Sequence, residues 1–299
     1  MSESTPRIGA LEAGGTKMVM AVATPDGTIL EDTAIPTTAP ADCVPQMIEW
    51  FAARDIDALG VAAFGPTGVD PKKDNFGYIL KTPKLEWAGY DFLGTLRRGL
   101  NMIPAGYDTD VNGSCLGEAT FGCARGLDTV LYLTIGTGIG AGVMVNGQLL
   151  HGMLHPEAGH IMLHKRDNDP GECVCPFHEG CFEGLAAGPS IEKRWGAKGV
   201  ELAERMEVWE LESDYIAEAL TDYIMSFSPQ KIILGGGVMK QEQMFPLVRK
   251  KVLANIAGYL DTPELADIDN YIVPNSLNEM QGILGCVELG RRALVAAQA

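Results

Sequence analysis

The chain of 299 residues is long enough to bury a sizeable core and to form two domains. Its formal net charge of −16 argues against nucleic acid or an anionic membrane as the main partner, because both attract basic patches. No stretch approaches the ~18 continuous apolar residues of a membrane span, and the N-terminus does not resemble a signal peptide. Four of the seven cysteines are scattered in apolar contexts, so we expect a globular protein of the reducing cytoplasm.

The N-terminal residues predict a β-meander with a glycine-rich turn. Residues 8–12 and 17–23 read as strands, and the sequence AGGT joins them. An Asp-Gly hairpin signal then precedes a third strand that begins at residue 28.

The middle of the chain repeats this pattern. A strand at 129–135 is followed by the turn GTGIG, a strand at 141–145, an Asn-Gly hairpin signal and a strand at 148–150. Two copies of the pattern predict a duplicated lobe. The alternative is that two unrelated glycine-rich hairpins look alike.

Helices and strands alternate around the two copies. Helical segments are expected at 42–53, 93–100, 112–120, 190–195, 215–226 and 281–297. Further strands are expected at 58–64, 104–107 and 231–234. This alternation predicts an α/β fold in which helices cover both faces of the sheets.

The Gly-Thr turns are candidate phosphate sites, because they point backbone N–H groups at one place and let an anion approach closely. The residues are Gly14, Gly15, Thr16 and Lys17 in the first turn, and Gly136, Thr137 and Gly138 in the second. A third cluster, at Gly235, Gly236 and Gly237, would admit a flat ligand such as adenine or ribose. A plain strand-to-helix turn would look the same.

Two other nucleotide motifs are excluded. No G-x-x-x-x-G-K-[ST] string occurs in the chain. Residues 136–141 match the dinucleotide fingerprint, but that motif must open a helix, and VMVNG reads as a strand and hairpin.

Asp110 lies between a short predicted strand and a helix. It is either an acid–base residue that projects into a cleft or the N-cap of the helix that begins near Asn112, and the residues alone favour neither. Asp108 is the nearest alternative carboxylate.

All five histidines fall between His151 and His178, and three cysteines lie at 173, 175 and 181. Such clustering in a cytosolic protein indicates a metal site rather than a disulfide. Tetrahedral zinc takes four N or S ligands, so one candidate is superfluous. The alternative is a surface loop with free thiols.

These segments together resemble the ROK family of bacterial sugar kinases, within the actin-like kinase superfamily. The resemblance covers nearly the whole chain, and it rests on LEAGGTK, TDVN, TIGTGIGAG, HPEAGH, CVCPFHEGCFEG and LGGG in the family's order. FGPTG, HPEAGH and CPFHEGCFEG resemble the fructokinase branch. The resemblance implies an α/β, two-lobe actin-like (ribonuclease H-like) ATPase fold with a duplicated β-meander and an interlobe cleft.

The resemblance also implies how the chain is divided. Residues 1–113 would form a small lobe on which a C-terminal helix at about 286–299 packs back. Residues 114–285 would form a large lobe with a zinc loop at about 155–183. A homodimer is a further family expectation.

Roles for single residues follow from the family's motifs. Asp110 becomes the catalytic base, the glycine turns become the ATP site, and Glu12 would help to hold Mg²⁺ through a water. Most members have Asp at the position of Glu12, which moves the carboxylate outward by one methylene here. The sugar would contact Gly65, Pro66 (for shape alone), Thr67, Asn112, Glu157 and Glu183.

The zinc ligands are selected by the fructokinase-like pattern C-P-x-H-x-x-C. Pro176 and Phe177 match this pattern, so the expected ligands are His160, Cys175, His178 and Cys181, with Cys173 as the competing thiolate. Four protein ligands leave no open position, so the zinc would be structural.

The expected activity is ATP-dependent phosphorylation of a hexose hydroxyl, with fructose converted to fructose 6-phosphate. A kinase of glucose, mannose or an N-acetylhexosamine is the alternative, because the ranking depends on a few hydrogen bonds. A sugar-sensing regulator of the same family is the alternative from another class. Such regulators carry an N-terminal helix-turn-helix, for which the turn at residue 13 leaves no room.

Overall fold

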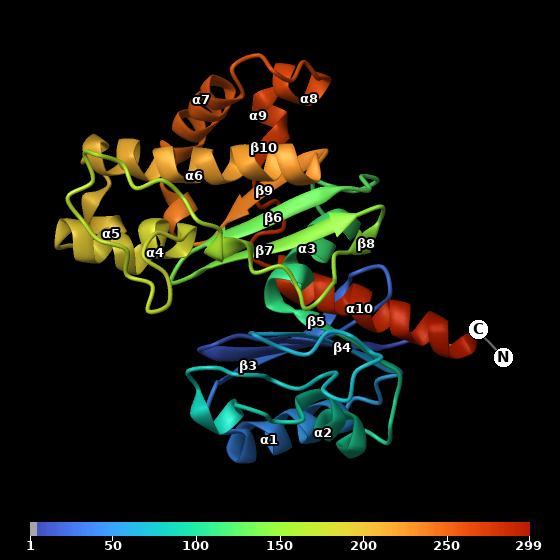
Figure 1. Cartoon of the computed structure of the whole chain (residues 1–299). Coiled ribbons are helices and arrows are strands. Elements are labelled where there is room, and N and C mark those ends of the chain that lie inside the picture. The colour runs from blue at the N-terminus through green and yellow to red at the C-terminus, as the bar shows by residue number, and fades with distance from the viewer. Residues whose placement is uncertain (1–4) are drawn as a thin grey trace. The chain divides into compact units, whose positions relative to one another are not determined.

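The computed structural model describes residues 5–299 and contains two compact units (Figure 1). Unit 1 comprises the residues up to Gly126 together with Leu149–His155 and Ser276–Ala299. Unit 2 comprises Leu127–Gln148 and Pro156–Asn275. Each unit is built on a sheet of five strands.

The sheet of unit 1 has the strand order β3-β2-β1-β4-β5. Its strands are β1 (Ile8–Ala13), β2 (Lys17–Ala23), β3 (Ile29–Pro36), β4 (Ala58–Ala63) and β5 (Ala105–Thr109). β1, β2 and β3 pair antiparallel as a meander, whereas β1, β4 and β5 run parallel. The carboxyl ends of the three parallel strands therefore meet at one edge of the sheet.

Helices cover both faces of this sheet, as the alternation of elements predicted. α1 (Pro40–Ala52) and α2 (Phe92–Gly99) pack with one set of strand side chains, which includes Leu11 and Val61. α10 (Gln281–Gln298) packs with the opposite set, which includes Ile8. This division follows from the two-residue period of a strand, which sends successive side chains to opposite faces.

α10 lies close to the backbone of the sheet. A Cβ atom at Gly60 would lie 1.7 Å from the carbonyl oxygen of Cys286, and one at Gly106 would lie 2.4 Å from that of Leu289. Glycine in β4 and β5 is therefore required for this helix to pack. α3 (Asp110–Thr120) and the short η1 turn (Leu85–Trp87) complete the helical elements named for unit 1.

The sheet of unit 2 repeats that of unit 1, in the order β8-β7-β6-β9-β10. The strands are β6 (Val130–Ile135), β7 (Ile139–Val145), β8 (Gln148–Leu149), β9 (Lys231–Gly235) and β10 (Ile272–Pro274). β6 pairs antiparallel with β7 and parallel with β9, as β1 does with β2 and β4. The predicted α/β fold with a duplicated meander is confirmed.

The helical elements of unit 2 follow or separate these strands (Figure 1). They are η2 (Ala158–His160), α4 (Phe182–Ala186), α5 (Gly188–Trp195), η3 (Gly199–Leu202), α6 (Met206–Phe227), η4 (Val238–Lys240), α7 (Met244–Ile256), α8 (Pro263–Ala266) and α9 (Ile268–Tyr271). α6 is longer than the predicted segment 215–226, and the sequence reasoning missed α7 and β10.

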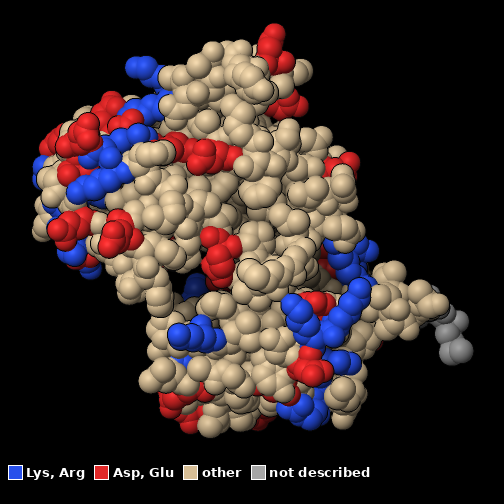
Figure 2. All heavy atoms as spheres, viewed as in Figure 1, with Lys and Arg blue, Asp and Glu red and all other residues tan. Residues whose placement is uncertain are grey.

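Acidic and basic side chains are interspersed on the face drawn in Figure 2, so the net charge of −16 is not gathered into one patch there. Among residues 5–299, no helix has the length and apolar character needed to cross a membrane.

Candidate active site

Asp110 is the first residue of α3 and directly follows β5. Thr109 caps this helix, because its hydroxyl oxygen accepts a hydrogen bond from the backbone N–H of Asn112 at 3.1 Å. The interpretation of Asp110 as the N-cap is therefore wrong. Its carboxylate accepts a hydrogen bond from its neighbour's backbone, Val111 N–H, at 2.9 Å.

Three segments with predicted site residues meet at the edge where the parallel strands end. Ala13 is paired with Ala63, and Ala63 with Thr109, so Glu12 and Asp110 both lie near this edge. Residues 65–67 follow β4 at the same edge. The predicted base, metal ligand and sugar-pocket residues of unit 1 are thereby brought together.

Burial changes the acidity of both carboxyl groups. It raises the pKa of Asp110 to about 6. Burial, and next the charge of Asp110, raise the pKa of Glu12 to about 7, while Lys17 opposes this shift. Two repelling carboxylates at one buried edge favour a divalent cation, for which carboxylate oxygens are suitable ligands.

The first glycine turn projects from this unit with its middle exposed. Gly14 N–H donates to the carbonyl of Lys17 at 3.0 Å, and the Thr37 hydroxyl donates to the carbonyl of Gly14 at 2.7 Å. Gly15, Thr16 and Lys17 are exposed. The turn is therefore held by its neighbours, while its tip remains available to an anion.

The segment after β4 is anchored by Thr67, which is fully buried. Its hydroxyl donates to the carbonyl of Tyr78 at 2.8 Å and is also hydrogen-bonded to the Tyr107 hydroxyl. Its backbone N–H donates to Nε2 of His155 at 3.4 Å. The Gly65–Pro66 peptide bond in this segment is cis.

Asp108 is buried behind the site, and each of its carboxylate oxygens has a partner. Oδ1 accepts from Thr109 N–H at 2.8 Å and from the Asn112 amide at 2.6 Å, and Oδ2 lies 2.9 Å from His151 Nε2. Asn112 is also fully buried, and its Oδ1 has no hydrogen-bond partner among the described residues. The sequence reasoning did not find the link from Asp108 to His151.

A pocket of about 520 Å³ in unit 2 contains the second glycine turn. The predicted residues Gly136, Thr137 and Gly237 line it. Further lining residues, which the sequence reasoning missed, are Gly188, Pro189, Ile191, Glu192, Lys198, Gly199, Val200, Trp209, Val238 and Gln241. The α5 N-terminus is joined to the turn, because Gly188 N–H donates to the carbonyl of Gly136 at 2.7 Å.

This pocket combines an anion site with apolar walls. The positive end of the α5 helix dipole lies beside the Gly-Thr turn, and Lys198 adds a positive charge. The N–H groups of Gly188 and Gly136 are already engaged, by the carbonyls of Gly136 and Gly138. Of the three consecutive glycines that begin with Gly235 at the end of β9, Gly237 alone lines the pocket. Gly236 has φ +89, and a Cβ there would lie 2.4 Å from the carbonyl oxygen of Ile135, so its requirement is conformational.

Glu183 in α4 supports the second turn. Its Oε2 accepts from the backbone N–H of Ile139 at 2.9 Å, and its Oε1 lies 3.8 Å from His160 Nε2. A Cβ at Gly138 would lie 2.8 Å from the same carboxylate, so a larger residue there would displace it. The predicted sugar contact Glu183 is therefore also a structural link between the turn and α4.

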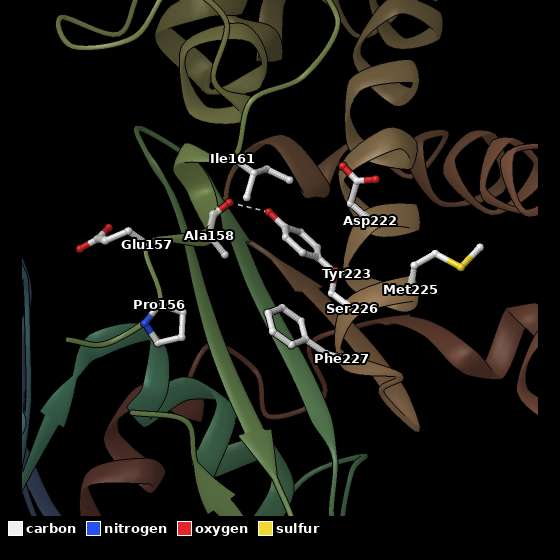
Figure 3. A pocket seen from close by; sticks show the side chains of 9 residues that line it. All are labelled: Pro156, Glu157, Ala158, Ile161, Asp222, Tyr223, Met225, Ser226 and Phe227. Carbon is white, nitrogen blue, oxygen red and sulfur yellow. Dashed lines mark hydrogen bonds between the residues drawn. The ribbon is translucent and has the colours of Figure 1, made fainter. Parts of the chain in front are cut away.

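Glu157 is exposed and precedes η2. Figure 3 shows it among the residues that line a second pocket of about 540 Å³, together with residues of α6, and with its carboxylate pointing away from Tyr223. The Tyr223 hydroxyl donates to the carbonyl of Ala158 at 2.5 Å, which fixes the segment that carries Glu157 and His160 to α6.

The structure brings His160, Cys175, His178 and Cys181 into one cluster, whose ligand atoms all lie within 4.8 Å of one another. Cys175 Sγ lies 3.4 Å from His178 Nδ1, and Cys181 Sγ lies 3.5 Å from His160 Nδ1. Tetrahedral zinc with bonds of ~2.3 Å to sulfur and ~2.0 Å to nitrogen would separate such atoms by about 3.5 Å. His160, Cys175, His178 and Cys181 are therefore suitable ligands for a tetrahedral zinc ion.

Cys173 occupies a different place in the loop. Its Sγ donates to the backbone carbonyl of His178 at 3.1 Å rather than joining the four clustered ligand atoms.

Known proteins share much of the sequence of this chain. The model of the ROK family matches residues 8–293. The chain belongs to the ROK family. It is 42% identical to the fructokinase of Pediococcus pentosaceus over 96% of this chain and 98% of that protein. It is 41% identical to the fructokinase of Streptococcus mutans, over 96% of each chain.

A solved ROK structure shows the same fold. The ROK hexokinase of Thermus thermophilus is 24% identical, with a TM-score of 0.80 over 98% of this chain and 100% of that one. The expectations of ROK membership and of the two-lobe α/β fold of this family are confirmed.

Proposed function

We propose that this protein is an ATP-dependent hexose kinase that converts fructose to fructose 6-phosphate. The observation that carries this proposal is the position of the Asp110 carboxylate at the edge where β1, β4 and β5 end, at which burial raises its pKa to about 6. A general base works best when its pKa is close to the working pH, because it is then ionised but still accepts a proton. The two fructokinases that are 41% and 42% identical to the chain support fructose as the sugar.

In this proposal Asp110 takes the proton of the sugar hydroxyl that attacks the terminal phosphate of ATP. The exposed turn from Gly14 to Lys17 and the pocket at Gly136 and Thr137 would provide the N–H groups for the phosphates. The apolar walls at Ile191 and Trp209 suit the adenine ring.

The sugar would be recognised by residues around the two motifs that the fructokinase branch shares. Glu157 and Glu183 would accept hydrogen bonds from hydroxyl groups, and residues 65–67 would shape the pocket. Asn112 is fully buried, so we assign it the orientation of Asp108 rather than a direct sugar contact.

Two metal ions belong to the proposal. Mg²⁺ bound with ATP would neutralise phosphate charge, and Glu12 would hold it through a water. Zinc would be held by His160, Cys175, His178 and Cys181 in a structural role. The contact from His160 Nε2 towards Glu183 is the kind that orients a ligating histidine.

The assembly and the location are also proposals. We propose a cytoplasmic homodimer, which the family resemblance implies, without nucleic acid as a partner. The net charge of −16 supports the last point.

A panel of hexoses tests the proposed substrate. ADP release would be measured with fructose, glucose, mannose and N-acetylglucosamine at equal concentrations. We expect the highest kcat/KM for fructose. If the zinc-loaded protein turns over none of these sugars, the kinase proposal is wrong; if glucose or mannose is preferred, the fructose assignment is wrong.

A further inference from the structure

Residues 149–155 belong to unit 1, although the chain on either side of them belongs to unit 2. Three polar contacts hold this segment. His151 Nε2 lies 2.9 Å from Asp108 Oδ2, Lys73 Nζ donates to the carbonyl of Met153 at 3.1 Å, and Thr67 N–H donates to His155 Nε2 at 3.4 Å. The segment is therefore held at residues 151, 153 and 155.

Two of these anchors lie at the edge that presents Asp110. Asp108 precedes it by two residues in β5, and Thr67 follows β4, whose last residue is paired with Thr109. The segment also directly precedes Pro156 and Glu157 in the chain. Its position is thus tied to the base and, along the chain, to a proposed sugar ligand.

Because Asp108 is buried, a positively charged partner stabilises it more than such a partner would stabilise a carboxylate on the surface. It is 2% exposed, and its other two donors, Thr109 N–H and the Asn112 amide, are neutral. His151, whose side chain is 33% exposed, can supply a positive charge. Removing the partner of a buried carboxylate leaves that charge uncompensated, which is costly.

We propose that His151 and Asp108 are positioning residues, whose pairing fixes residues 149–155, and through His155 the backbone of Thr67, beside Asp110. This inference rests on the proposed sugar-kinase function. Neither residue needs to touch the sugar or the reacting atoms. Loss of the pair therefore weakens sugar binding, while proton transfer to Asp110 continues.

The pairing depends on pH. The charged groups that act on His151 are Asp108 and Asp70, which lies in the loop after β4. Lys73 Nζ lies 3.9 Å from the carboxylate of Asp70. The hydrogen bond to Asp108 raises the pKa of His151 above its usual value of 6.5. The ion pair is complete below the usual pKa and is lost as pH rises through the raised value. The neutral ring can still donate one hydrogen bond, so the segment is loosened rather than released.

The test compares His151→Gln with His164→Gln. Glutamine keeps a donor near the place of Nε2 but cannot become positive. His164 Nδ1 makes a similar contact with Glu218 at 2.7 Å, but its side chain is 92% exposed, so it provides the matched control. We expect His151→Gln to raise the fructose KM roughly three- to tenfold at pH 6.5 with kcat changed less than twofold, and to abolish the rise of KM with pH.

An equal fructose KM and an equal pH profile in His151→Gln and wild type would overturn the proposal, as would a loss confined to kcat. Lys73→Met provides a second variant, which removes the contact with Met153 and should raise KM in the same direction. His164→Gln should match wild type.

Hydrogen exchange separates this proposal from the proposed function. Without any sugar, amides of residues 149–155 should exchange faster in His151→Gln than in wild type and His164→Gln. Unchanged exchange overturns the positioning role whether or not the protein phosphorylates a hexose. Faster exchange together with no activity on any hexose supports the anchoring and rejects the kinase.

Discussion

At the scale of single residues, burial gives Asp110 the property that a base requires. Thr109, rather than Asp110, caps α3. Both carboxylate oxygens of Asp108 are engaged by Asn112 and His151. Asp110 is therefore the carboxylate that neither caps the helix nor forms this pairing. Its pKa of about 6 means that it is mainly ionised at neutral pH. Below that pH the protonated form cannot accept the hydroxyl proton.

This pKa predicts how activity depends on pH. We expect kcat/KM for fructose to fall about tenfold per pH unit below pH 6, because one proton inactivates the base. Steady-state rates in constant ionic strength buffers would show the fall. Rates that stay level well below pH 6 would show that Asp110 is not the titrating base.

At the scale of elements, the proposed zinc site would stabilise the loop from residue 155 to 183 through its Cys/His cluster. Cys175→Ser should lose the zinc and unfold this loop, because metal binding there contributes directly to folding. Cys173→Ser is the matched control, since its thiol lies on the carbonyl of His178, and it should keep one zinc per chain. Metal analysis of both purified variants is the measurement; zinc lost from Cys173→Ser and kept in His178→Ala would reverse the ligand assignment.

The packing of α10 on β4 supplies a prediction of stability. Gly60→Ala should lower the free energy of unfolding by about 1–3 kcal/mol, because the new methyl group would meet the backbone of Cys286. Gly152→Ala, which has open space around its Cβ, should change stability little. Urea denaturation compares the two, and equal midpoints would contradict the close packing.

Local signals made the strands and turns predictable. The Gly-Thr turns and the hairpins at Asp26-Gly27 and Asn146-Gly147 depend on residues adjacent in sequence, and both residues of the second hairpin have positive φ. The start of α6 was missed because four of the nine residues in MEVWELESD are acidic and interrupt its apolar positions. α7 was missed because a proline near its start and the basic RKK run obscure its apolar positions.

The sequence identified the candidate site residues that lie in contiguous motifs. It did not identify those that the fold brings together from distant segments. Asp110 and the clustered Cys and His side chains lie in short motifs. The pocket wall at Trp209 and Lys198, and the pairing of Asp108 with His151, join segments that are distant in sequence. No local pattern identifies such partners.

At the scale of the whole molecule, two sheets of identical strand order carry different parts of the chemistry. Unit 1 holds Asp110 and Glu12 at the end of its parallel strands, and unit 2 holds the pocket with the second glycine turn. The duplication explains why both units end a strand in a Gly-Thr turn. Membership of the ROK family is consistent with this division.

The central claim is that Asp110 accepts the proton from the sugar hydroxyl during phosphoryl transfer. The most direct test is ADP formation from fructose and ATP by wild type, Asp110→Asn and the exposed-loop control Asp74→Asn. The account predicts that Asp110→Asn lowers kcat by about 10²–10⁴-fold with unchanged ATP binding, and that the control matches wild type. Full turnover by Asp110→Asn would contradict it.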